Sequence, residues 1–144
     1  MKQTVSRFLK CCDGSSAVEF AILALPMFLL LLGSVEAGRA YWTSQAVKDV
    51  ATSVARCIGV ARPECAPDGT YDTAAAVSYG TAAARGFGVL LDPGSIVIDE
   101  NGECAGVRGF AIVTVSYRFS SPIELIFPDE IIMIGSSCYP VTRV

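Results

Sequence analysis

Histidine is absent from all 144 residues of the sequence. Histidine is the commonest general base and a frequent ligand of zinc and haem iron, so its absence removes Ser–His and Cys–His arrangements and most zinc and haem schemes. No glycine-rich phosphate loop follows an expected strand, because Gly86-Phe87-Gly88 follows an expected helix and lacks the lysine of such loops. We therefore expect no enzyme activity, no cofactor, no metal and no small-molecule substrate.

Basic residues are scarce, with 11 Lys and Arg against 14 Asp and Glu. The first fourteen residues carry Lys2, Arg7 and Lys10 against Asp13, and the acidic excess lies in the remainder. Nucleic-acid binding calls for basic patches, so we expect no nucleic-acid partner. Because positively charged flanks stay in the cytoplasm, the N-terminus is expected inside and the C-terminus outside.

One long uncharged apolar run extends from Phe20 to Val35. Extended back to Ala17 it has about nineteen residues, enough to cross a hydrocarbon core. Pro26 removes one helical hydrogen bond and predicts a bend. Tyr41 and Trp42 follow the run as interface anchors, which puts the membrane part at about 17–42.

The helical pattern continues beyond the apolar run. Val47, Val50, Val54 and Cys57 recur at three- and four-residue steps, as on one face of an amphipathic helix. The sequence therefore predicts one helix over 15–58, with Gly59 as its stop. A cleaved secretory signal is the alternative, but it does not explain the uninterrupted periodicity.

Residues 59–144 are expected to form an α+β head on this helix. A loop reaches Gly69, and a second helix is predicted over Tyr71–Arg85, capped by Asp68 or Thr70 ahead and by Gly86 or Gly88 behind. Asp92-Pro93-Gly94 predicts a turn.

Three antiparallel strands are expected after this turn, over Ser95–Asp99, Cys104–Phe119 and Ile131–Val141, with Pro122–Glu130 as a connection. Asn101-Gly102 predicts a tight hairpin turn between the first two strands. Alternation puts Ala111, Val113, Val115 and their period-two neighbours on one face of the second strand, and Gly135 is a candidate bulge in the third.

Four of the six cysteines lie beyond the apolar run, while Cys11 and Cys12 precede it. An even set outside the cytoplasm favours disulfides. Spacing and strand ends favour Cys57–Cys65 and Cys104–Cys138, although four cysteines allow three pairings. Zinc on four thiolates is the metal alternative, against which no Cys-x-x-Cys pair exists.

The start of the helix carries an unusual motif, Gly14-Ser15-Ser-Ala-Val-Glu19-Phe20, in which one acid enters an apolar segment. Together with Pro26, Glu36-Ala-Gly-Arg39 and the ending Ala-Arg-Cys57, it resembles the TadE-like family of minor pilins or pseudopilins of bacterial tight adherence (Tad, Flp pilus) systems. Glu36 and Arg39 stand three residues apart, and their simplest interpretation is a surface ion pair of little energetic consequence.

The resemblance implies that residues 1–14 are a cytoplasmic leader, cut after Gly14 by a prepilin peptidase to leave Ser15 as the new N-terminus. Glu19, at the fifth mature position, then pairs with the amine of a neighbouring subunit and sets its register, with Pro26 on the same assembly helix. The alternative is that Glu19 only marks the membrane edge.

The implied protein is a single-pass inner-membrane component with a periplasmic head, found in the membrane or, after assembly, in a surface pilus. Its partners would be the peptidase, other pilins or pseudopilins, and the Tad inner-membrane assembly platform. An unprocessed membrane-anchored periplasmic binding module and a pseudopilin of a related secretion machine are the alternatives.

Overall fold

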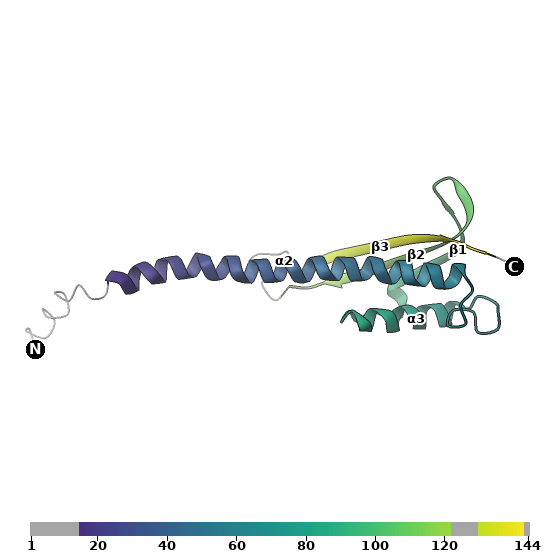
Figure 1. Ribbon diagram of the computed structural model, residues 1–144, viewed down its shortest axis with the longest axis horizontal. Coiled ribbons are helices and arrows are strands. Elements are labelled where there is room, and N and C mark those ends of the chain that lie inside the picture. The colour runs from purple at the N-terminus through teal and green to yellow at the C-terminus, as the bar shows by residue number, and fades with distance from the viewer. Residues whose placement is uncertain (1–14, 122–129, 143–144) are drawn as a thin grey trace, which may run out of the picture. The chain divides into compact units, whose positions relative to one another are not determined.

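The computed structural model describes residues 15–121 and 130–142 of the chain. It shows a long N-terminal helix, a second helix and a three-stranded antiparallel sheet, which confirms the predicted α+β class (Figure 1). The chain divides into two compact units, one ending at Ala37 and one beginning at Gly38. The elements are α2 (Ser15–Gly59), α3 (Thr73–Gly86), the short 3-10 helix η2 (Pro93–Ser95), β1 (Ile96–Cys104), β2 (Val107–Phe119) and β3 (Ile131–Pro140).

Helix α2 ends where the sequence predicts, but the role of Gly59 differs. The carbonyl of Gly59 accepts hydrogen bonds from the backbone N–H and the hydroxyl of Thr142, at 3.0 and 2.9 Å. A Cβ on Gly59 would lie 2.7 Å from the carbonyl oxygen of Pro140. Glycine is therefore needed here for the close approach of the end of β3, while the left-handed residue past the helix is Ala61, with φ 48°.

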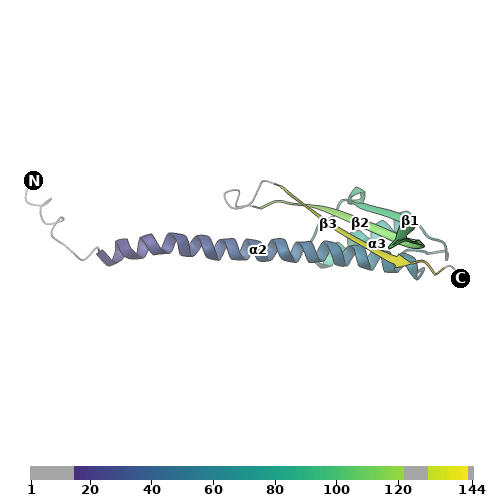
Figure 2. The same ribbon diagram turned by 90° about the horizontal axis from the view of Figure 1, so that it is seen from above.

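Both helices cover the same face of the sheet. Ile96 of β1, Val115 of β2 and Gly135 of β3 lie directly opposite one another, so they share a face. A Cβ on Gly80 of α3 would meet the Ile96 side chain at 2.8 Å, and one on Gly135 would meet the backbone of Val47 at 2.8 Å. Hence α3 packs on β1 and the C-terminal part of α2 packs on β3, in a two-layer head whose strands run alongside that part of α2 (Figure 2).

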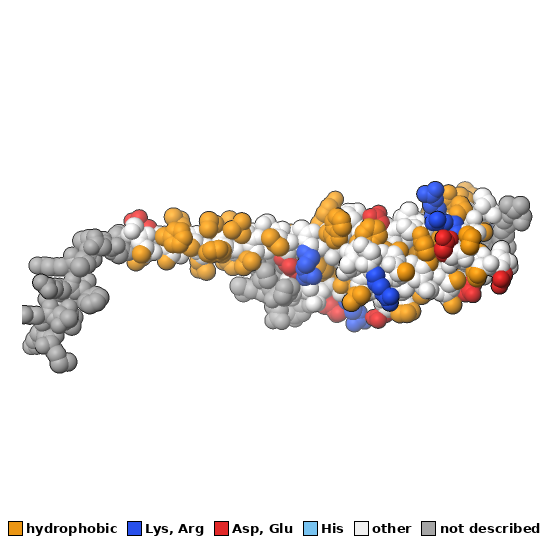
Figure 3. Space-filling model, turned by 60° about the horizontal axis from the view of Figure 1, so that its bottom comes forward, with side chains coloured by type: hydrophobic (Ala, Val, Ile, Leu, Met, Phe, Trp, Pro, Cys, Tyr) orange, Lys and Arg blue, Asp and Glu red, His pale blue; other side chains and the backbone are white. Residues whose placement is uncertain are grey.

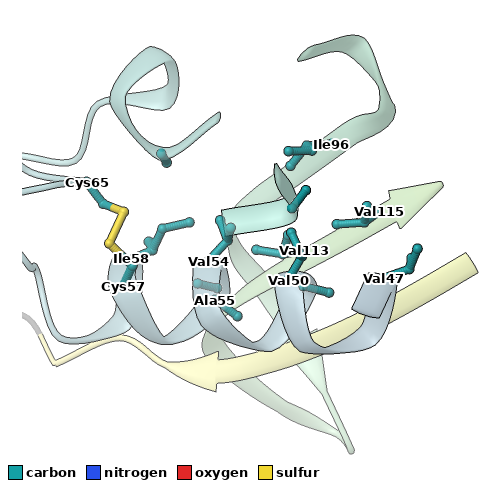
Figure 4. Close-up of a cluster of buried hydrophobic side chains, with 14 of the residues drawn as sticks. Val47, Val50, Val54, Ala55, Cys57, Ile58, Cys65, Ile96, Val113 and Val115 are labelled. Carbon is teal, nitrogen blue, oxygen red and sulfur yellow. A yellow bond between two sulfur atoms is a disulfide. The ribbon is translucent and has the colours of Figure 1, made fainter. Parts of the chain in front are cut away.

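The core lies between the valines of α2 and those of β2 (Figure 4). Val47, Val50 and Val54 are at most 1% exposed, and Val113 and Val115 are fully buried. Burying each such side chain contributes about 1.5–3 kcal/mol. The predicted helical stripe and the predicted alternation of β2 are therefore the two halves of one core.

Helix α3 begins later than predicted. Its N-cap is Asp72, whose Oδ1 accepts hydrogen bonds from the N–H groups of Ala74 and Ala75 at 2.7 and 3.2 Å, so Asp68 and Thr70 were the wrong caps. The loop extends to Asp72 because the Asp72 N–H donates to the carbonyl of Cys65, which holds it against the disulfide-bonded loop.

The end of α3 follows the sequence more closely. Phe87 is the C-cap, and Gly88 takes φ 76°, a left-handed conformation that favours glycine. The N–H of Val89 returns to the carbonyl of Ala84 at 3.0 Å. Gly88 is thus the terminator that the sequence predicts.

The hairpin turn between β1 and β2 is at Ala105-Gly106, so the prediction at Asn101-Gly102 was wrong. Both turn residues have positive φ, 52° and 83°, as a two-residue turn of this kind requires. Gly102 instead lies inside β1 at a break in register, buried against the side chain of Ile112. The glycine serves a β-bulge, and β1 consequently runs to Cys104.

Gly135 is not a bulge, because β2 and β3 pair in unbroken register from Phe110 opposite Pro140 to Phe119 opposite Ile131. Its missing side chain lets the backbone of α2 approach the strand. In the predicted connection Pro122–Glu130, residues 122–129 lie outside the described residues, so that connection remains a prediction.

Disulfides join Cys57 to Cys65 and Cys104 to Cys138, with Cα–Cα separations of 6.0 and 6.4 Å. These are the pairs that the sequence predicts, but Cys104 ends β1 and does not begin β2. Cys138 lies opposite Ile112, so the second bond links the two outer strands across β2.

We expect Gly135→Ala to lower the free energy of unfolding by about 1–3 kcal/mol, because its Cβ would overlap helix backbone that has no rotamer to change. Gly94→Ala is the matched control, since a Cβ there meets nothing within 4 Å. Thermal unfolding of the full chain in detergent, followed by circular dichroism, measures both. Equal melting temperatures for the two variants would contradict the close helix–strand contact.

Candidate functional site

The first part of α2 exposes apolar side chains on every face. The large exposed residues in this stretch are Val18, Phe20, Ile22, Leu23, Leu25, Met27, Phe28, Leu29, Leu30, Leu31, Leu32 and Val35. Figure 3 shows these side chains covering the visible face of this part of the helix. A helix that is hydrophobic all round is stable in lipid or among other helices, not alone in water.

This helix is the one candidate membrane span among the described residues. Its most apolar window has a mean hydropathy of 2.2, and none of that window is buried. By length and composition it is able to cross a bilayer, in agreement with a membrane anchor.

Of the predicted processing residues, Gly14 lies outside the described part of the chain. Helix α2 begins at the next residue, Ser15. Glu19 and Phe20 are both exposed, Phe20 at 67%. Glu19 is also the one charged residue between Ser15 and Val35. The acid is therefore exposed and is not part of the protein's own core.

Pro26 lies inside α2, and the helix continues through it. Proline has no N–H, so the carbonyl of Ile22 loses its usual helical partner. Glu19, Pro26 and Gly33 recur every seven residues, which puts them on one stripe of the helix. The structure thus aligns an acid, a proline and a glycine along an otherwise leucine-rich surface.

The contacts of Arg39 were not predicted from the sequence. Its Nη2 donates to the carbonyl oxygen of Ser120 at 2.8 Å, and its guanidinium lies 4.2 Å from the ring centroid of Phe119. The side chain therefore ties α2 to the end of β2. The two positions are about eighty residues apart, so no local pattern indicates this contact.

Glu36 is 5% exposed, so the expectation that it lies on the surface was wrong. Both side chains have interaction partners in the folded chain. A buried carboxylate is costly without partners, and Glu36 is not without them.

A hollow of about 500 Å³ lies at the other end of the head, beside the Cys57–Cys65 disulfide. Its lining includes Ile58, Tyr71, Glu100 and Thr142. Burial raises the pKa of the Tyr71 phenol, and the charges of Glu100 and Asp72 add to the rise, while a hydrogen bond with Thr73 opposes it. Tyr71 therefore stays protonated at neutral pH and is a hydrogen-bonding group, not a base.

Part of the chain matches a known protein family. Residues 14–56 match the family model described as TadE-like protein. The match begins at Gly14 and covers most of α2, which confirms the resemblance predicted from the motif. No curated protein and no solved structure matches the chain.

We expect Arg39→Ala to destabilise the head by about 1–3 kcal/mol, through loss of a charged hydrogen bond and a cation–π contact. Arg108→Ala removes another arginine, whose side chain is 87% exposed and 3.7 Å from Glu103, and should change stability little. Melting temperatures of the full chain in detergent compare the two. If the melting temperature of Arg39→Ala were no lower than that of Arg108→Ala, the contact of Arg39 with β2 would not stabilise the head.

Proposed function

We propose that this chain is a structural component or assembly factor of a Tad (Flp-type) pilus, a minor pilin or pseudopilin. A prepilin peptidase cuts after Gly14, and the protein then assembles through its N-terminal helix. The observation that carries the proposal is the TadE-like match over residues 14–56, on a helix whose apolar side chains are exposed on all sides.

Glu19 supports an assembly role on physical grounds. A charged side chain near hydrocarbon is costly, so an intramembrane acid generally has a partner. Cleavage after Gly14 would free the α-amine of Ser15, a cation that no uncut chain has at this depth. Glu19 would pair with this amine on an adjacent subunit at the right height. A subunit at the wrong height would leave the acid unpaired, so the pairing would fix the register between subunits.

The stripe of Glu19, Pro26 and Gly33 supports helix-to-helix contact. Small residues let helix backbones approach closely in membranes. A carbonyl released by proline is available to a polar group of a neighbouring helix. We infer that this stripe faces another pilin or pseudopilin, while the leucines on the remaining faces contact lipid before assembly.

The same proposal includes topology and partners. The N-terminus would lie in the cytoplasm and the head in the periplasm, because Lys2, Arg7 and Lys10 precede the apolar run. The periplasm is oxidising, which suits the two disulfides of the head. Besides the peptidase, the expected partners are other pilins and the Tad inner-membrane assembly platform.

An unprocessed binding module would use the head and leave the N-terminus intact; the hollow beside Tyr71 is the feature it would need. Within the described residues no group of His, Cys, Asp and Glu side chains is arranged to hold a metal there. A pseudopilin of a secretion machine would share the cleavage but export a protein.

Cleavage is tested at Gly14. We expect the wild-type protein from cells to begin at Ser15, and Gly14→Lys to retain residues 1–14, because the peptidase cleft requires a residue without a side chain. Gln3→Lys adds the same charge elsewhere in the leader and should be processed normally. Intact-mass spectrometry reads all three; a wild-type protein that still begins at Met1 would exclude processing.

Register is tested at Glu19. We expect Glu19→Gln to be processed yet to reduce surface filaments about tenfold, since a pairing energy of about 1.4 kcal/mol corresponds to a tenfold change in an equilibrium. Asp49→Asn is the matched control, as it neutralises an exposed acid further along the same helix. Filaments are counted by electron microscopy. Equal counts in the two variants would show that Glu19 has no role in assembly.

A further inference from the structure

Exposed aromatic and apolar side chains gather at the end of the head where α2 enters it. We name Tyr41, Trp42, Phe87 and Leu90 the basal patch; their exposed fractions are 69%, 61%, 37% and 78%. The Nε1–H of Trp42 donates to the carbonyl oxygen of Phe87 at 3.4 Å, which brings the segment after α3 beside α2. All four residues belong to the unit that begins at Gly38.

The segment after α3 is held in a fixed turn. The N–H groups of Phe87 and Val89 donate to the carbonyl of Ala84, and that of Gly88 donates to the carbonyl of Arg85, each at 3.0 Å. Val89 is 4% exposed and anchors the turn in the core. Leu90, the next residue, is thus presented outward by an ordered backbone.

Helix geometry gives the height of the patch. A bilayer core of about 30 Å needs about twenty helical residues, and counted from Phe20, just after the acid, these end at Arg39. In a bilayer that α2 spans in this way, Tyr41 and Trp42, within the next turn of the helix, would lie at the depth of the headgroups. The Trp42–Phe87 hydrogen bond holds the turn after α3 beside Trp42, so the turn would lie at the same depth.

We propose that the basal patch rests in the interfacial layer of the bilayer, so that the turn after α3 is a second membrane contact of the head besides α2. Tryptophan and tyrosine favour this layer because their rings are apolar at one end and polar at the other. The proposal depends on the membrane insertion of α2 that is part of the proposed function.

Opposite charges lie together beside Leu90. Asp92 and Arg118 line one hollow with it, and Arg118 lies 3.6 Å from Glu130. The basal patch itself consists of apolar and aromatic side chains, so uncharged phosphatidylcholine is the appropriate probe.

The experiment uses the fact that Trp42 is the only tryptophan. In the full chain with Trp42 kept, so that its hydrogen bond to Phe87 stays in place, a second tryptophan is added by Leu90→Trp, by Val107→Trp or by Phe28→Trp, and the signal of Trp42 is subtracted with the unsubstituted chain. Val107 is the matched control, because it is also an exposed apolar residue but lies far from the patch. It begins β2, about 40 Å along the strand from Phe119, the residue at the other end of β2 that contacts Arg39. Each variant is reconstituted in phosphatidylcholine vesicles, with or without bromine on the acyl chains.

We expect acyl-chain bromine near the glycerol to quench the tryptophan at 90 about twofold more than that at 107, because only position 90 reaches the interface. Mid-chain bromine should quench the tryptophan at 28. Equal quenching at 90 and 107, with 28 quenched, would overturn the second contact and leave the proposed function intact. Absence of quenching at 28 would show that α2 is not inserted, and would overturn both.

Discussion

The contact between the valines of α2 and those of β2 is the interaction on which the head depends. Val50 and Val54 of the helix and Val113 and Val115 of the sheet are at most 1% exposed and belong to one core cluster, to which α3 adds Ala76 and Ala84. Valine and alanine make up most of this core, so the area it removes from water is modest. The two disulfides supplement it, each by about 2–4 kcal/mol in the usual range.

Helix α2 has two kinds of surface along its length. Up to Val35 its apolar residues are exposed on every face, whereas from Ala46 onward one face is buried and the other is polar. Glu36 and Arg39 lie at the change, and Arg39 contacts the end of β2. The division matches the division of roles in our proposal: one part for membrane and neighbouring subunits, the other for holding the head.

Much of this protein follows from local pattern. The bounds of α2, the alternation of β2 and the Gly14-to-Phe20 motif depend on residues within a few turns or pleats of each other, where backbone geometry alone determines which side chains share a face. Both disulfide pairs also follow from spacing and strand order. The candidate site is largely such a local feature, which explains why the sequence alone indicates it.

The tertiary structure decided what the glycines and the long polar side chains do. Gly102, beside an asparagine, indicates a turn, yet packing on Ile112 makes it a bulge, and Gly135 serves the close approach of α2. Arg39 and Trp42 gain partners far away in the sequence. A missing side chain or a long donor is equally suited to several local structures, and only the neighbour that packing brings to it determines which one forms.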